Sequence, residues 1–359
     1  MDMEKQFDIE AFTDYYEKQI ESHERFLKGI EILSNTNYDE IDTTPKEIVF
    51  TMDKMKLYHY KPHAKKVNPV PVLIVYALMN RQYIMDLQQS KSFVKKLSEL
   101  GLDVYMVDWG YPTAEDMYIT MEDYVEDYFG SAVDYIRRTT GCDKINLMGK
   151  CMGGTFAAMY TSLHPEKVLN LVTIAAPFEF DIEDGVLFKW SKHMDTDKMV
   201  NAYNMIPGDM LNFFFIMLNP YHLSTGKYIG LMDVLDNAKI MKDFVHMEKW
   251  IFDCPDQAGE YYKTWMKDLW SENKLKKGEF YLGDKHIDLK KITHPVLNVY
   301  GDKDNLIPMS SSIPFLDMIS SKDKEEACFP VGHAGIVASS RSQKFIAPKI
   351  AEWVWAHSK

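Results

Sequence analysis

The sequence has no apolar run long enough to cross a membrane as a helix. Such a helix needs about 20 consecutive apolar residues, and the nearest candidate, Met210 to Leu218, is shorter and is interrupted by Asn212. The first residues, Met1 to Gln6, are acidic and lack the apolar segment of a secretory signal. We therefore expect a cytoplasmic protein with no membrane span.

Cysteine is scarce as well. The 359 residues include four cysteines, and their spacing fits no common metal-binding motif. In a cytoplasmic protein they are expected to be reduced thiols. The sequence therefore predicts no metal site and no disulfide framework; the cysteines are Cys142, Cys151, Cys254 and Cys328.

Basic residues are fewer than acidic ones. There are 41 Lys and Arg residues against 53 Asp and Glu, a formal net charge of −12, which argues against nucleic acid as a partner. Hydrophobic residues make up 46% of the chain, enough for a large core in one elaborated domain or in a core with a cap.

The most informative segment runs from Leu147 to Gly154 and reads Leu-Met-Gly-Lys-Cys-Met-Gly-Gly. It follows a short apolar run and precedes a helix-like stretch, which is the setting of the Gly-x-Ser-x-Gly nucleophile elbow of α/β-hydrolases. Cys151 occupies the position of the serine, and flanking glycines are needed where strand and helix cross closely. The alternative is a buried cysteine in an incidental glycine-rich turn.

Two further residues complete a triad in the order nucleophile, acid, histidine. A predicted strand, 295–300, leads into a polar turn that contains Asp302 and Asp304. We assign the acid to Asp304 and expect Asp302 to cap the turn. His333 follows a second strand end in a glycine-rich loop, a setting suited to a mobile acid–base. The other histidines are expected to be surface or core residues.

The remaining pattern predicts an α/β fold with a mostly parallel sheet and an N-terminal helix. Short apolar strands alternate with helices up to Pro177, the segment from about 178 to 289 is helical, and the strand pattern then resumes. This suggests core residues 1–177, an inserted helical cap at 178–290 and a second core part at 291–359. The predicted strands are 47–50, 57–60, 72–76, 104–108, 145–148 and 170–174, with helices around 92–100 and 124–138.

With these motifs in place, the chain resembles the catalytic subunit of class III polyhydroxyalkanoate synthases, which have an α/β-hydrolase fold. Beyond the elbow, the resemblance covers the predicted strand and loop 72–81, the strand 103–110 and the cap segment 247–259. One departure is Lys150, which stands where the family carries an uncharged residue. A cation there could alter thiolate stability or contacts with coenzyme A (CoA).

The resemblance implies polymerisation of (R)-3-hydroxyacyl-CoA, with 3-hydroxybutyryl-CoA as the expected substrate, into polyester with release of CoA. Cys151 would form a covalent thioester, with His333 as the base. Asp304 would orient the imidazole or help to activate the substrate hydroxyl. The backbone N–H groups of Met152 and Met79 would form the oxyanion hole. CoA is then part of substrate and product, and no cofactor is expected.

The resemblance also implies partners and a location. They are the growing polyester chain, a second helical synthase subunit of the PhaE type (alternatively the PhaR type), a second catalytic subunit in a homodimer, and the surface of cytoplasmic polyester granules. An apolar stripe on the predicted N-terminal helix could dock such a partner or pack on its own domain; it comprises Ile9, Phe12, Tyr16, Ile20, His23, Leu27 and Ile30.

Two other functions compete with this one. A cysteine hydrolase of the dienelactone hydrolase or thioesterase type shares the nucleophile but is smaller and lacks a long cap. A granule-surface scaffold without activity would not need the set Cys151, Asp304 and His333.

Overall fold

The structure is a computed structural model that describes residues 9–37 and 39–358. The chain divides into two compact units, each assembled from separate segments. The smaller unit contains residues 1–40 and 219–249, and the larger one contains residues 41–218 and 250–359.

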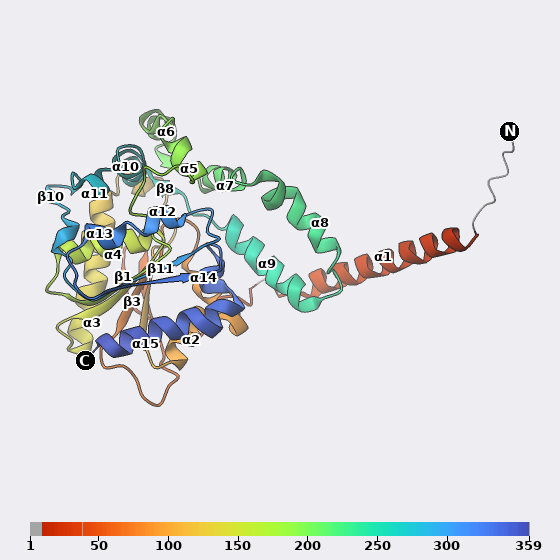
Figure 1. Cartoon of the computed structure of the whole chain (residues 1–359), viewed down its shortest axis with the longest axis horizontal. Coiled ribbons are helices and arrows are strands. Elements are labelled where there is room, and N and C mark those ends of the chain that lie inside the picture. Colours follow the sequence, from red (N-terminus) through yellow and green to blue (C-terminus); the bar gives the residue numbers. More distant parts are fainter. Residues whose placement is uncertain (1–8, 38, 359) are drawn as a thin grey trace. The chain divides into compact units, whose positions relative to one another are not determined.

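An extended sheet forms the centre of the larger unit. Within the described residues it has eight strands in the order β1-β2-β4-β3-β5-β6-β11-β12 (Figure 1). The pairs β1–β2 and β2–β4 are antiparallel, and all other neighbours are parallel. The α/β fold with a mostly parallel sheet is confirmed. The strands are β1 (Lys46–Met52), β2 (Met55–Tyr60), β3 (Val72–Val75), β4 (Val104–Asp108), β5 (Ile145–Lys150), β6 (Val168–Ile174), β11 (Val296–Gly301) and β12 (Lys324–Phe329).

Helices cover this sheet. Two of them, α2 (Phe93–Glu99) and α15 (Ala347–His357), pack against each other, and α4 (Met152–Leu163) packs against β5 and β6. The central strands β3, β4 and β5 are buried along their whole length, as expected for parallel strands with helices on both faces. The other helices of this unit are α3 (Gly130–Thr140), α5 (Val186–Ser191), α6 (Thr196–Tyr203), α7 (Gly208–Ile216), α10 (Gly259–Thr264), α11 (Lys274–Lys277), α12 (Met309–Ser312), α13 (Phe315–Met318) and α14 (Gly335–Ala338).

The segment predicted to be wholly helical also contains strands. A short pair, β7 (Met205–Ile206) and β8 (Gln257–Ala258), is antiparallel, and so is the hairpin β9 (Tyr281–Leu282) with β10 (Lys285–His286). The hairpin turns at Gly283, whose φ is 57°. Glycine followed by aspartate is a common two-residue hairpin turn, because glycine adopts positive φ without strain.

The smaller unit is helical and includes α1 (Ile9–Asn35), α8 (Lys227–Met232) and the first part of α9 (Ala238–Phe252). Lys242 pairs with Glu40 and Lys249 with Asp39, and Gly29 lies against Leu235. On α1, Ile20, Leu27 and Ile30 are about half exposed, at 57%, 54% and 49%. The stripe side chains of Ile9, Phe12 and Tyr16 lie outside the described residues.

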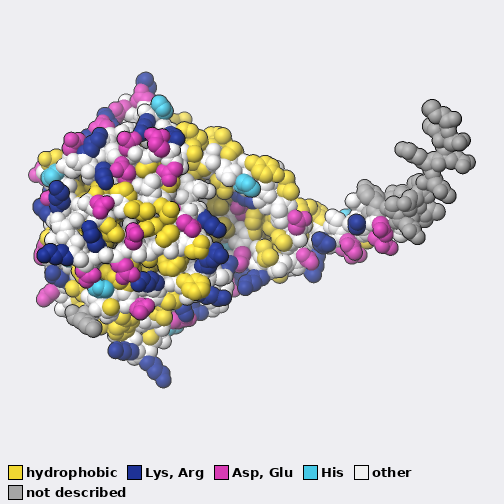
Figure 2. All heavy atoms as spheres, viewed as in Figure 1, with side chains coloured by type: hydrophobic (Ala, Val, Ile, Leu, Met, Phe, Trp, Pro, Cys, Tyr) yellow, Lys and Arg dark blue, Asp and Glu magenta, His cyan; other side chains and the backbone are white. Residues whose placement is uncertain are grey.

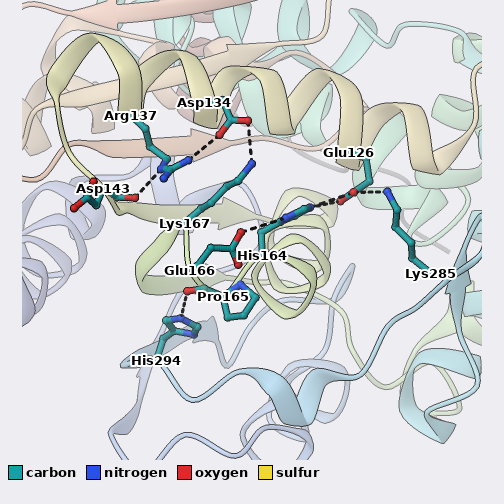
Figure 3. Close-up of polar contacts among 10 residues, drawn as sticks. All are labelled: Glu126, Asp134, Arg137, Asp143, His164, Pro165, Glu166, Lys167, Lys285 and His294. Carbon is teal, nitrogen blue, oxygen red and sulfur yellow. Dashed lines mark hydrogen bonds and ion pairs between the residues drawn. The ribbon is translucent and has the colours of Figure 1, made fainter.

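A network of charged groups links elements near the end of α4 (Figure 3). His164 follows α4, and its ring contacts the Glu126 carboxylate at 2.9 Å. The same carboxylate accepts a hydrogen bond from Lys285 of β10 at 2.6 Å. Glu126 belongs to a π-helical segment, Asp123–Phe129, that leads into α3. One carboxylate therefore connects three elements that are distant in sequence.

We expect Glu126→Gln to lower the free energy of unfolding by about 1–2 kcal/mol at neutral pH, because it removes one charge from two charge-assisted hydrogen bonds. Burial raises the pKa of Glu126, but Lys285 and His164 outweigh this and hold the pKa below its usual value. This stabilisation is therefore present above the unfolded carboxyl pKa of about 4.3 and is lost as the pH decreases through the lower folded pKa.

Urea unfolding of wild type and variant measured from about pH 7 to about pH 3 would check this, and the difference between them should shrink towards acid pH. Glu166→Gln is a matched control. Its carboxylate lies 3.7 Å from His164 and is 63% exposed. The Glu166→Gln substitution should therefore lower the free energy of unfolding by less than about 0.5 kcal/mol. Equal costs for the two variants would contradict the role given to Glu126.

Candidate active site

The turn between β5 and α4 carries Cys151. Its backbone is strained, with φ 56° and ψ −129°, a conformation that is costly for a residue with a side chain. A Cβ atom added to Gly153 would lie 2.1 Å from the carbonyl oxygen of Val75, and one on Gly149 would lie 2.3 Å from that of Gly153. The close crossing of strand and helix thus requires glycines and places Cys151 at the tip of the turn.

His333 and Asp304 meet at the carboxyl edge of the sheet. His333 Nδ1 lies 2.7 Å from Asp304 Oδ2, in the loop between β12 and α14. Asp304 Oδ1 accepts hydrogen bonds from the backbone N–H groups of Leu306 and Ile307. The Asp304 side chain is 1% exposed and that of His333 is 13% exposed. The acid is therefore fixed on both oxygens.

The expected role of Asp302 is wrong. Asp304, rather than Asp302, caps the turn with its side chain, and Asp302 is exposed. One aspartate performs both tasks because its two oxygens point in different directions, one towards the N–H groups of the turn and one towards His333.

Lys150, the cation next to the nucleophile in sequence, is buried in the site. It is the last residue of β5, and its side chain is 1% exposed. Its Nζ atom lies 2.5 Å from Nε2 of His333. The predicted strand 145–148 ended before Lys150, and nothing in the sequence indicated a contact with a residue 183 positions away.

The thiol of Cys151 is activated by its surroundings. Burial raises its pKa, but the charge of His333, a hydrogen bond with His333, the Lys150 ammonium and the N–H of Met152 together lower it below the usual value. Burial likewise raises the pKa of Asp304, yet His333 and Lys150 lower it overall. Burial lowers the pKa of His333, and Asp304 more than compensates. This arrangement favours a thiolate beside a proton-carrying imidazole.

Cys151 and His333 open into a cavity of about 180 Å³ within the larger unit. Its walls are mostly aromatic and apolar, so an acyl group can enter while water is largely excluded. The lining includes Met79, Met152, Leu187, Trp190, Leu211, Phe214, Phe215, Trp250, Tyr262, Trp265, Trp270 and Ile307. Phe214 and Phe215 line this cavity, whereas Phe213 is 57% exposed.

The loop after β3 forms one edge of the cavity and is held in several places. Asn80 Nδ2 donates to the carbonyl oxygens of Trp250 and Ile251, and the indole of Trp250 donates to the carbonyl of Arg81 at 2.7 Å. Arg81 is itself paired with Asp108 at 2.6 Å. Met79 precedes this anchored stretch and lines the cavity beside Cys151. In the part of the chain that the structure describes, no cluster of His, Cys, Asp or Glu could hold a metal ion.

Sequence comparison places this geometry in a known group. A sequence model described as alpha/beta hydrolase fold matches residues 70–337, and one described as poly-beta-hydroxybutyrate polymerase (PhaC) N-terminus matches residues 35–97. The poly(3-hydroxyalkanoate) polymerase subunit PhaC of Allochromatium vinosum is 42% identical over 97% of this chain and 99% of its own length. The corresponding PhaC subunit of Synechocystis is 45% identical over 92% of this chain and 90% of its own length.

The chain belongs to the PhaC polymerase family. The resemblance to class III synthases is thereby confirmed, and the chain is an acyltransferase with an α/β-hydrolase fold.

Solved structures share the fold of this PhaC-family chain. A putative lipase from Sulfolobus solfataricus superposes with a TM-score of 0.56 at 15% identity, over 88% of this chain and 97% of that one. The monoacylglycerol lipase of Paleococcus ferrophilus superposes with a TM-score of 0.52 at 17% identity, over 84% of this chain and 99% of that one. No helix among the described residues is long and apolar enough to cross a membrane.

The four thiols of this PhaC-family chain should differ in reactivity. Burial raises the pKa of Cys254 to about 11, whereas that of Cys151 is lowered. We expect iodoacetamide near neutral pH to label Cys151 before Cys254, although neither thiol is fully exposed. Peptide mass spectrometry of samples quenched over time would give the order. His333→Gln should slow labelling of Cys151 alone; unchanged labelling in that variant would refute the pairing.

Proposed function

We propose that this chain polymerises (R)-3-hydroxyacyl-CoA, with 3-hydroxybutyryl-CoA as substrate, and releases CoA through a covalent thioester on Cys151. The observation that carries the proposal is a cysteine with a lowered pKa, hydrogen-bonded to a His333–Asp304 pair, at the end of an apolar cavity. Family membership supplies the class of reaction.

In the first step the Cys151 thiolate attacks the thioester carbon of the substrate. The negative oxygen that forms is met by the backbone N–H of Met152 and by one from Met79, each donor contributing about 3 kcal/mol to lowering the barrier. The carbon–sulfur bond to CoA breaks, and His333 gives its proton to the departing sulfur. A thioester replaces a thioester of similar energy, so the acyl group stays activated.

In the second step the 3-hydroxyl of another acyl unit attacks the thioester on Cys151. His333 takes the hydroxyl proton, an ester bond forms, and Cys151 leaves as thiolate. Asp304 holds the imidazole with Nδ1–H directed at the Asp304 carboxylate, as in other triads, or it helps to activate the 3-hydroxyl of the acyl unit. Serine at position 151 would give a less activated ester, which suits hydrolysis better than chain growth.

Chain growth requires a place for product and a partner. We propose a second helical subunit of the PhaE type, with the PhaR type as the alternative, together with a homodimer of the catalytic chain at the surface of cytoplasmic polyester granules. Apolar side chains on the smaller unit support an apolar partner or surface, since exposed apolar patches often mark such contacts. On α8, Tyr228, Ile229 and Met232 are 45%, 55% and 49% exposed, in a region where hydrophobic side chains gather (Figure 2).

Incubation with 3-hydroxybutyryl-CoA tests the function. We expect polymer and free CoA from the wild type, no polymer from Cys151→Ala, and at most a trace from Cys151→Ser, because alanine has no nucleophile and serine is far weaker than a thiolate. Mass spectrometry should find the acyl group on Cys151. Free acid with CoA would indicate a hydrolase, and neither product would indicate a scaffold. Acylation at Cys142, Cys254 or Cys328 would refute the assignment.

Asp304 and Asp302 form a matched pair two residues apart. Asp304→Asn should reduce kcat by about 10³–10⁴-fold, because an orienting acid is lost, while the exposed Asp302→Asn should change kcat little. Initial rates of CoA release give the comparison. If Asp304→Asn acylates Cys151 at a normal rate but does not elongate, the hydroxyl-activating role is supported; similar losses in both variants would contradict the assignment of the acid.

The partner proposal predicts a role for the apolar face of α1. Co-expression with the helical subunit should raise the specific activity and shorten the lag, because the partner binds one state of the enzyme preferentially. Ile20→Ser with Leu27→Ser should weaken this activation more than the basal rate. Lys18→Ser with Arg25→Ser, on the other side of the helix, is the control. Full activity of the isolated chain, without a lag, would refute the proposal that it needs the helical subunit.

A further inference from the structure

The peptide unit between Leu78 and Met79 carries one of the two proposed oxyanion donors. Its N–H belongs to Met79, which lines the cavity together with Cys151. Its carbonyl oxygen belongs to Leu78, which is buried and is not part of the cavity wall. In a trans peptide these two groups point in opposite directions, because the unit is planar. A group that binds the Leu78 carbonyl therefore also sets the direction of the Met79 N–H.

Gln257 binds that carbonyl. Its Nε2 atom lies 3.1 Å from the oxygen of Leu78, and 3.0 Å and 3.4 Å from the carbonyl oxygens of Pro255 and Asp256 on its own segment. Three acceptors around one atom identify it as the amide nitrogen, since the side-chain oxygen has no hydrogen to donate. Gln257 is 2% exposed and, like Leu78, is not part of the cavity wall.

The N–H of Met79 is available to a ligand. In the described ranges 9–37 and 39–358, no group accepts a hydrogen bond from it. Buried backbone N–H groups are rarely left without an acceptor, so a free donor at the wall of an apolar cavity fits an oxygen of the ligand. The side chain of Asn80 anchors the next residue, but both backbone dihedrals of Met79 separate that anchor from the N–H.

The cap holds Gln257 through a short strand pair. Gln257 of β8 pairs with Ile206 of β7, and Ala258 pairs with Met205. Ile206 and Ala258 are fully buried, so packing fixes the register of the pair. The group that binds the loop after β3 thus comes from a cap segment 179 positions away from Leu78.

We propose that Gln257 is a positioning residue for the reaction. It binds the Leu78 carbonyl from outside the cavity and thereby directs the Met79 N–H at the oxyanion that forms on the carbon bonded to Cys151. The hydrogen bond also polarises the peptide unit, which strengthens its N–H as a donor. This inference rests on the proposed function for its catalytic meaning, since acyl transfer is the step that needs an oxyanion hole.

The test compares two reactions of the same Sγ atom. A trifluoromethyl ketone with a propyl group adds to the Cys151 thiolate: the bond from Sγ to the carbonyl carbon forms, and the electron pair of the carbonyl goes to its oxygen. Iodoacetamide alkylates the same thiolate with loss of iodide, and no oxyanion forms. A misdirected oxyanion donor therefore weakens the first reaction alone, whereas a distorted site changes both.

Gln257→Met keeps an unbranched stem but has no N–H group. We expect it to raise the dissociation constant of the ketone by about 10–100-fold, below the full effect of losing an oxyanion donor, and to leave the alkylation rate unchanged. Protection of Cys151 against alkylation measures the ketone affinity. Asp256→Ala is the matched control on the same segment, because the Asp256 carboxylate accepts from the N–H of Gly208 at 2.9 Å. It should change neither reaction.

Unchanged ketone affinity in Gln257→Met would overturn the proposal. An equal loss in Asp256→Ala would do the same, because it assigns the effect to a loosened segment. If Gln257→Met does not fold, the wild type decides: with ¹⁵N-methionine label, the Met79 amide proton should shift downfield when the ketone binds, and an unshifted signal overturns the proposal. Neither reaction uses acyl-CoA, so a wild type that makes no polymer refutes the proposed function alone.

Discussion

The close crossing of β5 and α4 is the constraint on which the site depends. There is no space for a Cβ atom at Gly149, Gly153 or Gly154, whose added atoms would lie 2.1–2.4 Å from neighbouring atoms. The crossing forces Cys151 into positive φ and directs the N–H of Met152, the first residue of α4, towards its sulfur. The strain in the turn is compensated by the burial of β5 and α4 in the core.

Around that turn, four ionisable groups share a small volume with aromatic walls. Each of Cys151, Asp304 and His333 would be less ionised if it were buried alone, and each shifts the opposite way because of its neighbours. The low polarity of the cavity strengthens these interactions, since Coulomb energies increase as the effective dielectric constant decreases. The ionic state of the site is therefore a property of the group and not of any single residue.

Much of this could be predicted because the signals are local. The strand 104–108 was predicted with its observed bounds, and the elbow follows from glycine spacing around Cys151. Other features depend on contacts between distant segments. Asp304 was predicted as the acid from its place in the turn, but its second task as the cap of that turn depends on the directions of its two carboxylate oxygens, which the sequence does not indicate. No sequence pattern indicated that Lys150 lies beside His333. Gly283 did indicate the β9–β10 hairpin, but the helical composition of the surrounding region favoured helix there.

The composition of the smaller unit has a consequence for synthesis on the ribosome. Residues 1–40 emerge before the segment 219–249 that completes their unit, which follows about 10–40 s later at ordinary elongation rates. During that interval Leu235 is missing from its place against Gly29, and so are the lysines that pair with Asp39 and Glu40. Until then helix α1 lacks the contacts that residues 219–249 provide, while the larger part of the sheet is already assembling.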